Sequence, residues 1–221
     1  MEKLSKKLKK VVDLHFENYY NESIKDGNLL KGRTNSIIYS NIYGLNTMIT
    51  ASLCRSFESS LGSLFDKLLY ESSIFFNGNA FTKINVNCKE SFKVDLGFER
   101  DKEINIFENK LHGELDNKKS EVEKIKLVER CEILQKLYPE KKINLFLGVV
   151  GNKNGGGASN WDKGRVGDWF SDDEIKVEED LYSYISGDEN FFLWFVDEIL
   201  PYIGIKYCEL EQMVYTIYNK N

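Results

Sequence analysis

The feature that most constrains the fold is a pair of alternating stretches joined by a short charged segment. In "SFKVDLGF" (91–98) apolar and polar side chains alternate with period two, which places four apolar residues on one face: Phe92, Val94, Leu96 and Phe98. "EINIFENK" (103–110) alternates in the same way, and the charged "ERDKE" between the two stretches is typical of a turn. The sequence therefore predicts a β-hairpin.

The predicted hairpin brings charged side chains together. Glu108 and Lys110 are two positions apart on one strand, so they point to the same face, and folding the hairpin places Asp95 on the neighbouring strand near them. Two carboxylates that close repel each other unless a cation lies between them, and oxygen ligands beside a lysine suit magnesium. The alternative is a solvated hairpin face with a surface ion pair.

This arrangement resembles the PD-(D/E)XK nuclease superfamily, whose signature is an acid on one strand, then an acid, any residue and a lysine on the next. The matching residues are Asp95 and Glu108-Asn109-Lys110, with Val94 where many members carry proline. The resemblance implies that Asp95, Glu108 and the backbone carbonyl of Asn109 hold Mg²⁺ and that Lys110 orients the attacking water. A competing acid-x-lysine pattern, Asp116-Asn117-Lys118, lies in turn-rich sequence rather than on a strand.

The elements around the hairpin agree with the same superfamily. A helix is expected over 45–72, with a possible break near Ser56 or Gly62, and a strand over 80–88. After the hairpin come a helix over 118–138 and a continuously apolar strand over 143–150. The residues expected to face inward on the helix 118–138 are Val122, Ile125, Val128, Leu134 and Leu137.

This order is the αβββαβ core of the superfamily, and it predicts an α/β (α+β) fold with a central mixed sheet flanked by helices. The chain is expected to form a single restriction-endonuclease-like domain over 1–221. Within it we expect an N-terminal helical and loop segment (1–44), a catalytic core with a DNA-reading loop (45–170) and an acidic C-terminal helical segment (171–221).

Glu58 is the candidate for a further acid of the site. It lies at the edge of an apolar helical stripe that includes Phe57 and Leu61, and in the superfamily a helix ahead of the catalytic strands often contributes an acid to the metal site. The alternative is a partly exposed acid at the margin of the stripe.

The segment 151–170 follows the apolar strand and is rich in glycine, asparagine and basic residues. Asparagine pairs well with adenine edges, and lysine or arginine with guanine edges, in the major groove. The candidate DNA contacts are Asn152, Lys153, Asn160, Lys163 and Arg165. The alternative is an ordinary flexible surface loop.

Charge and hydropathy bound the partners. The net charge is −5, but residues 171–198 alone carry −9, so the remainder carries +4 and leaves room for a local basic surface that contacts phosphates. No apolar run is long enough to span a membrane and no signal core follows the basic N-terminus, so a cytoplasmic protein is expected. An aromatic-rich helix over 189–200, ended at Pro201, is expected either in the core or at a subunit interface.

Together these features indicate a type II restriction endonuclease. The resemblance implies Mg²⁺-dependent cleavage of double-stranded DNA at a short palindromic site by a homodimer, each subunit cutting one strand to leave 5′-phosphate products. Two alternatives stay open: a structure-specific repair or junction nuclease of the same fold, and a non-catalytic DNA-binding or interaction protein.

Overall fold

The computed structural model describes residues 1–25, 29, 45–86, 91–112, 117–151 and 168–218. By their contacts, these residues group into two compact units. The first unit comprises residues 1–64 and 195–221, and the second comprises residues 65–194. The expected division of one domain at residues 44 and 170 stays a prediction.

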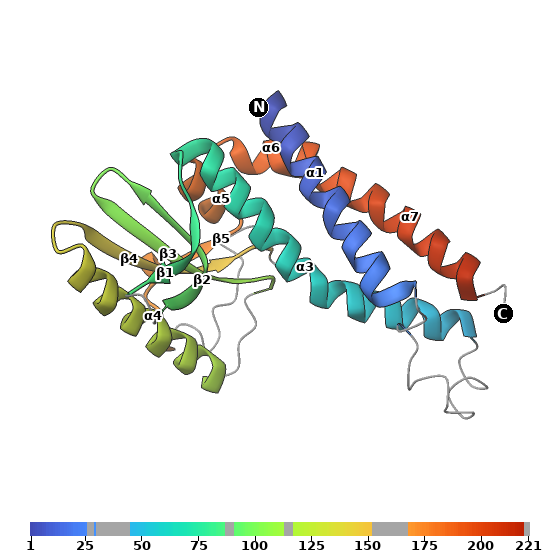
Figure 1. Cartoon of the computed structure of the whole chain (residues 1–221), viewed down its shortest axis with the longest axis horizontal. Coiled ribbons are helices and arrows are strands. Elements are labelled where there is room, and N and C mark those ends of the chain that lie inside the picture. Colours follow the sequence, from blue (N-terminus) through green and yellow to red (C-terminus); the bar gives the residue numbers. More distant parts are fainter. Residues whose placement is uncertain (26–28, 30–44, 87–90, 113–116, 152–167, 219–221) are drawn as a thin grey trace. The chain divides into compact units, whose positions relative to one another are not determined.

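The second unit is built on one five-stranded sheet, with the strands in the order β1-β2-β3-β4-β5 (Figure 1). The first three strands are antiparallel, and β3, β4 and β5 are parallel. Their bounds are Phe81–Asn85, Ser91–Arg100, Glu103–Lys110, Lys142–Val149 and Ile175–Val177. The mixed sheet flanked by helices confirms the expected fold class. Strand β5 was not predicted, and it interrupts the acidic segment that was expected to be helical.

The predicted hairpin is confirmed as β2 and β3. Their pairing runs from Leu96 opposite Phe107 to Arg100 opposite Glu103. Asp101 takes a positive φ of 54° in the turn, a conformation that aspartate tolerates better than most residues. The strand expected over 143–150 is also present as β4, but only its second half is fully buried.

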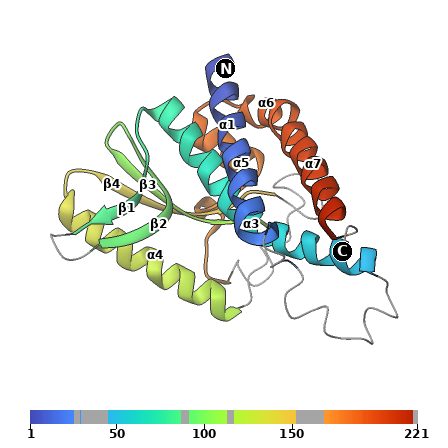
Figure 2. The ribbon, with the colours of Figure 1, turned by 45° about the vertical axis from the view of Figure 1, so that its right-hand side comes forward.

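Helix α4 (Asn117–Leu137) runs along one face of the sheet, as Figures 1 and 2 show. Its inward face differs from the predicted one. Leu134 is buried as expected, but four of the residues predicted to face inward are exposed: Val122, Ile125, Val128 and Leu137. Leu127 and Leu134 enter the core instead.

The position of Lys124 explains this difference. Its ammonium group lies 2.5 Å from a carboxylate oxygen of Glu174 and 5.0 Å from the centre of the Phe170 ring. Both partners come from the segment that leads into β5, Glu174 from the short 3₁₀ helix η5 (Asp172–Glu174). Because the ion pair and the ring compensate the lysine, the more polar face of α4 can pack towards the sheet.

The opposite face of the sheet carries an aromatic layer. Tyr184 of α5 (Glu179–Ser186) contacts Phe98, Phe107 and Phe146 at ring-centre distances between 4.7 and 6.4 Å. Its hydroxyl donates to Oδ1 of buried Asn105 at 2.8 Å, which satisfies both polar groups within the layer.

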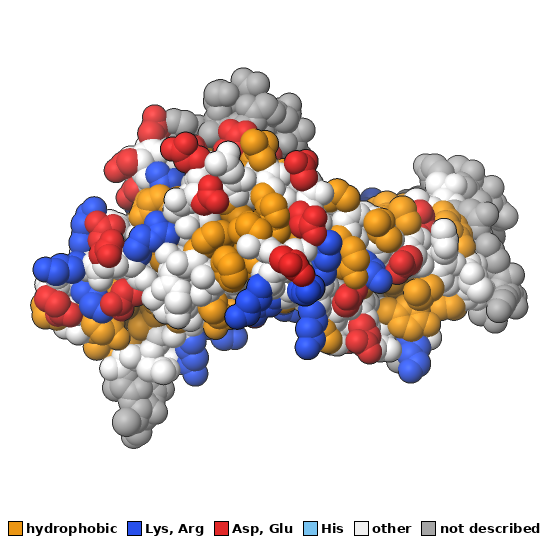
Figure 3. Space-filling model, turned by 90° about the horizontal axis from the view of Figure 1, so that it is seen from above, with side chains coloured by type: hydrophobic (Ala, Val, Ile, Leu, Met, Phe, Trp, Pro, Cys, Tyr) orange, Lys and Arg blue, Asp and Glu red, His pale blue; other side chains and the backbone are white. Residues whose placement is uncertain are grey.

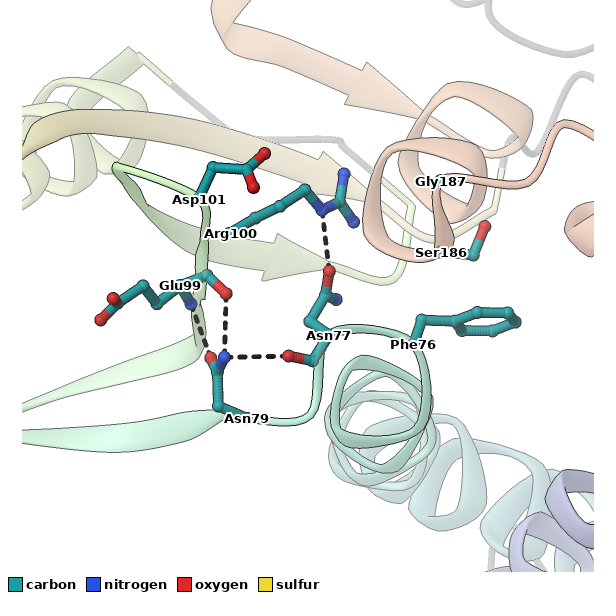
Figure 4. A pocket seen from close by; sticks show the side chains of 8 residues that line it. All are labelled: Phe76, Asn77, Asn79, Glu99, Arg100, Asp101, Ser186 and Gly187. Atoms are coloured by element: carbon teal, nitrogen blue, oxygen red, sulfur yellow. Dashed lines mark hydrogen bonds between the residues drawn. The ribbon is translucent and has the colours of Figure 1, made fainter.

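Helix α3 (Leu45–Asn77) is continuous, without the predicted break near Ser56 or Gly62. Its C-terminal end is fixed to the sheet at the hairpin end of β2 (Figure 4). Arg100 donates from Nε to Oδ1 of Asn77 at 2.8 Å and from Nη2 to the carbonyl of Ile185 at 2.7 Å. Asn79 accepts from the backbone N–H of Glu99 at 2.7 Å and donates to the Glu99 carbonyl at 2.9 Å. These bonds hold the second half of α3 against β2.

The first unit consists of helices. It contains α1 (Glu2–Tyr19), the π-helical turn Tyr20–Ile24, the first part of α3 and α7 (Leu200–Tyr218). The ring of Phe57 packs against Phe16, Tyr19 and Tyr207 at centre distances of 4.8 to 5.6 Å. None of the helices within the described ranges is long and apolar enough to cross a membrane.

The aromatic-rich helix is α6 (Phe191–Glu198), and it ends before Pro201. Pro201 lies in the first turn of α7, where its missing N–H breaks no helical hydrogen bond. The stretch 205–219, which the sequence left ambiguous, is helical up to Tyr218. The ring of Phe191 packs on Phe76, Tyr182 and Trp194 within the second unit, so it contributes to the packing of this unit.

Candidate active site

Glu108 and Lys110 meet at the C-terminal end of β3, on the face predicted for them. The Lys110 ammonium donates to Oε1 of Glu108 at 2.7 Å. On the other side of the same carboxylate, Nη1 of Arg130 from α4 lies 3.5 Å from Oε2. Glu108 is only 9% exposed, so both cations act on it with little screening by water. Arg130 was not singled out in the sequence.

Asp95 joins this group through the backbone of β3. Its Oδ2 accepts a hydrogen bond of 2.8 Å from the N–H of Asn109, the residue between Glu108 and Lys110. Burial raises the pKa of the Asp95 carboxyl, and the nearby charge of Glu108 raises it further. The structure therefore brings together the three charged residues of the predicted motif.

A fourth charged residue, Asp66, comes from α3. The amide Nδ2 of Asn109 donates to Oδ1 of Asp66 at 3.0 Å. Burial raises the pKa of Asp66 to about 7, and the charge of Asp95 adds to the shift. Asp66 was not predicted from the sequence: it lies two positions from each of the buried residues Leu64 and Leu68, on another side of the helix, so the apolar periodicity of α3 does not mark it.

Glu58, the helix acid predicted from the sequence, precedes Asp66 by eight positions on α3 and is exposed. It belongs to the first compact unit, whereas the residues around Asn109 belong to the second. Its participation in the site stays a prediction, and the described contacts single out Asp66 instead.

Lys110 is held as a cation. Burial by itself would lower its pKa, but the hydrogen bond and the charge of Glu108 outweigh burial and raise the pKa above its usual value. A lysine in this state offers a fixed positive charge at neutral pH rather than a base.

The donor set fits a magnesium ion. Burial first, and the neighbouring carboxylates second, raise the pKa of Asp66 and of Asp95, and a divalent cation would relieve both the burial of charge and the repulsion. Among the described residues, no three His, Cys, Asp or Glu side chains form a ready-made cage. Magnesium does not need one, because it usually takes one or two carboxylates and fills its shell with waters and substrate phosphates.

The predicted DNA contacts Asn152, Lys153, Asn160, Lys163 and Arg165 lie outside the described residues. The competing pattern Asp116-Asn117-Lys118 falls outside the described side chains. Figure 3 shows acidic and basic side chains intermingled on the face that it draws.

Comparison with known proteins bears on this site directly. The family model described as type II restriction endonuclease, HinfI, matches residues 77–199, which is more than half of the chain. No curated protein and no solved structure matches. The matched range contains Asp95, Glu108, Lys110 and Arg130. The chain belongs to the HinfI family of type II restriction endonucleases, of the PD-(D/E)XK type.

Proposed function

We propose that this protein cleaves double-stranded DNA at a short specific site in a Mg²⁺-dependent reaction that leaves 5′-phosphate and 3′-hydroxyl ends. The observation that carries the proposal is the meeting of Asp95, Glu108 and Lys110 at the end of the hairpin, inside the range matched by the restriction endonuclease family. That match favours restriction over the repair-nuclease and non-catalytic alternatives.

Asp95 and Glu108 would hold the metal, with the backbone carbonyl of Asn109 as a further ligand. When bound, Mg²⁺ would polarise the scissile phosphate and lower the pKa of the attacking water. The water oxygen loses a proton to solvent and forms a bond to phosphorus, and the bond from phosphorus to the 3′-oxygen breaks, so that the 3′-oxygen leaves and takes up a proton from solvent.

Lys110 contributes charge rather than proton abstraction. Its raised pKa keeps the proton on Nζ at neutral pH, so the ammonium group orients the water and stabilises the negative charge that develops on the phosphate oxygens. Arg130 lies beside the same carboxylate and fixes Glu108 from the α4 side.

We assign the role of the helix acid to Asp66. Its carboxyl is half-buried and bonded to Asn109, and the charges of Asp95 and Glu108 reach it. An acid placed this way can accept a hydrogen bond from a metal-bound ligand or complete the metal shell. Glu58, by contrast, is exposed.

Sequence reading and assembly complete the proposal. A palindromic site cut on both strands requires two active sites, which a homodimer supplies. The segment 151–165 is proposed to carry base recognition, because it follows β4 and concentrates side chain types that read base edges. The protein would be cytoplasmic, where its DNA substrate lies.

A plasmid digest tests the function. With Mg²⁺ the wild-type protein should give discrete bands, and the ends should ligate without added kinase. Asp95→Ala should bind a cognate duplex with little loss but cleave it at least about a thousandfold more slowly, since phosphate and base contacts lie elsewhere. Cleavage by Asp95→Ala near the wild-type rate would remove Asp95 from the site, and the absence of discrete bands from wild type would exclude sequence-specific cutting.

A further inference from the structure

Asn109 does more than separate Glu108 from Lys110. Its backbone N–H donates to Asp95 at 2.8 Å, and its side-chain Nδ2 donates to Asp66 at 3.0 Å. One residue thus contacts two carboxylates that come from different elements, β2 and α3. Its side chain is 8% exposed, so these bonds are shielded from water.

Gly148 of β4 provides the space for this side chain. It lies opposite Asn109 in the parallel pairing of β3 and β4. A Cβ atom at position 148 would lie 2.4 Å from Oδ1 of Asn109 and 3.1 Å from Cδ1 of Leu181. Both distances are shorter than ordinary van der Waals contact, so any residue larger than glycine would displace the amide.

The hydrogen bonding of the Asn109 side-chain amide is incomplete, which is unexpected for a residue whose role is only to stabilise the fold. Its Oδ1 is buried and has no hydrogen-bond partner among the residues that the structure describes. A buried acceptor without a partner costs about 1–3 kcal/mol, so an apolar residue that fills the same space would serve stability better. An asparagine here therefore calls for another explanation.

We propose that Asn109 is a positioning residue whose side chain, wedged against Gly148, holds the carboxylate of Asp66 in place beside Asp95 for the metal. The donor pair fixes where both acids lie before the metal arrives. Without it, the negative charges at the end of the hairpin would push Asp66 away from the site. This inference rests on the proposed Mg²⁺ site, and it explains how an acid from α3 is tied to the two strands.

Two substitutions disturb the same contact from opposite sides. Asn109→Ala removes the amide, and Gly148→Ala displaces it without changing any acid. Each should raise the Mg²⁺ concentration for half-maximal single-turnover cleavage about tenfold, as expected for residues that orient metal ligands. The rate at saturating Mg²⁺ should recover most of its wild-type value. Asn144→Ala, which removes a comparable amide bonded to Asn105 and Glu103 on the same sheet, is the matched control and should leave the titration unchanged.

A second measurement does not depend on cleavage. In the DNA-free protein, the rise in unfolding temperature on adding Mn²⁺ reports metal affinity directly. It should be clearly smaller in Asn109→Ala and Gly148→Ala than in wild type and Asn144→Ala. The double variant should respond like either single one, because both act through one contact.

The outcomes separate the two proposals. A wild-type protein that neither responds to Mn²⁺ nor cleaves would overturn the proposed function, and this inference with it. A responsive wild type beside an Asn109→Ala variant with unchanged titrations would overturn the positioning role alone. An additive double variant would overturn the wedge between Gly148 and Asn109. Should Gly148→Ala fail to fold, Asn109→Ser replaces it, and an unchanged titration in Asn109→Ser would count against the role in the same way.

Discussion

The two halves of α3 present acids in very different surroundings. In the first half, Phe57 packs among aromatic rings of α1 and α7 while its neighbour Glu58 is exposed. In the second half, Asp66 is half-buried and accepts a hydrogen bond from Asn109. Glu58 borders the apolar stripe of Phe57, Leu61 and Leu64, whereas Asp66 lies two positions from Leu64 and Leu68 on another side of the helix, so periodicity alone favours Glu58.

Asp66 is distinguished by a known polar partner far away in the sequence, inside the candidate site. Asn109 lies 43 positions after Asp66, and only the folded sheet brings the two together. A half-buried acid with a specific donor and neighbouring like charges is typical of functional sites, whereas an exposed acid at the edge of a stripe is common on any helix. The comparison therefore gives opposed predictions for Glu58 and Asp66.

The largest expected effect tests directly whether Asp66 or Glu58 supports the candidate site. Asp66→Asn keeps the shape of the side chain and removes its charge, so it should lower the single-turnover cleavage rate at least about a hundredfold, the upper part of the range for groups that support a metal site. Glu58→Gln, its matched control on the same helix, should change the rate less than about twofold.

The contrary result is equally informative. A shift of the Mg²⁺ dependence in Glu58→Gln, with Asp66→Asn close to wild type, would favour the helix acid predicted from the sequence. Circular dichroism of both variants should match that of wild type, so that a lost helix is not mistaken for a lost acid.

A smaller effect should appear in the pH dependence of stability. Because the pKa of Asp66 rises from its usual 3.8 to about 7 in the folded protein, the folded state binds more protons than the unfolded state between these values. Metal-free stability should therefore fall as pH rises from about 4 to about 7, and Asp66 should account for about 2 kcal/mol of the fall after allowance for solvent screening.

Urea unfolding in the presence of a chelator measures this contribution. The difference in free energy of unfolding between wild type and Asp66→Asn should grow steadily from low to neutral pH, with Asp66→Asn the more stable at neutral pH. Glu58→Gln should keep the wild-type slope. Parallel curves for wild type and Asp66→Asn would show that Asp66 is not buried among like charges.

How much the sequence could predict depends on whether a feature is set by neighbouring residues or by contacts between residues far apart in the sequence. The hairpin and its motif depend on alternation within a few residues, and the structure confirms the hairpin. The inward face of α4 could not be read in this way, because apolar residues occur on two sides of that helix and the choice depends on Glu174, 50 positions away from Lys124. Asp66 and Arg130 escaped notice for the same reason, since each is identified only by a partner on another element.

Asn109 illustrates a further limit. The motif assigns no role to its middle residue, so the sequence suggested only a backbone carbonyl as a ligand. Its side-chain contact with Asp66 and the close approach of Gly148 emerge only from the packing of α3, β3 and β4. Local patterns therefore predicted the motif residues, and long-range packing showed which further residues contact them.

The smallest expected effect concerns α4. This helix places a basic side chain, Arg130, next to the candidate site, where α3 places the acidic side chain of Asp66. Arg130 is 17% exposed and lies 3.5 Å from Glu108, whereas Lys126, four positions earlier, is 47% exposed and pairs only with Glu123 among the described contacts. Arg130→Met should free one side of Glu108 and slow single-turnover cleavage about tenfold, while Lys126→Met should have almost no effect.

Arg130→Lys should recover part of the loss, because it restores the charge without the planar geometry of the guanidinium. Equal cleavage rates for Arg130→Met and Lys126→Met would mean that Lys110 alone positions Glu108. Buried charged residues would then matter more for cleavage than exposed ones on α3, but not on α4.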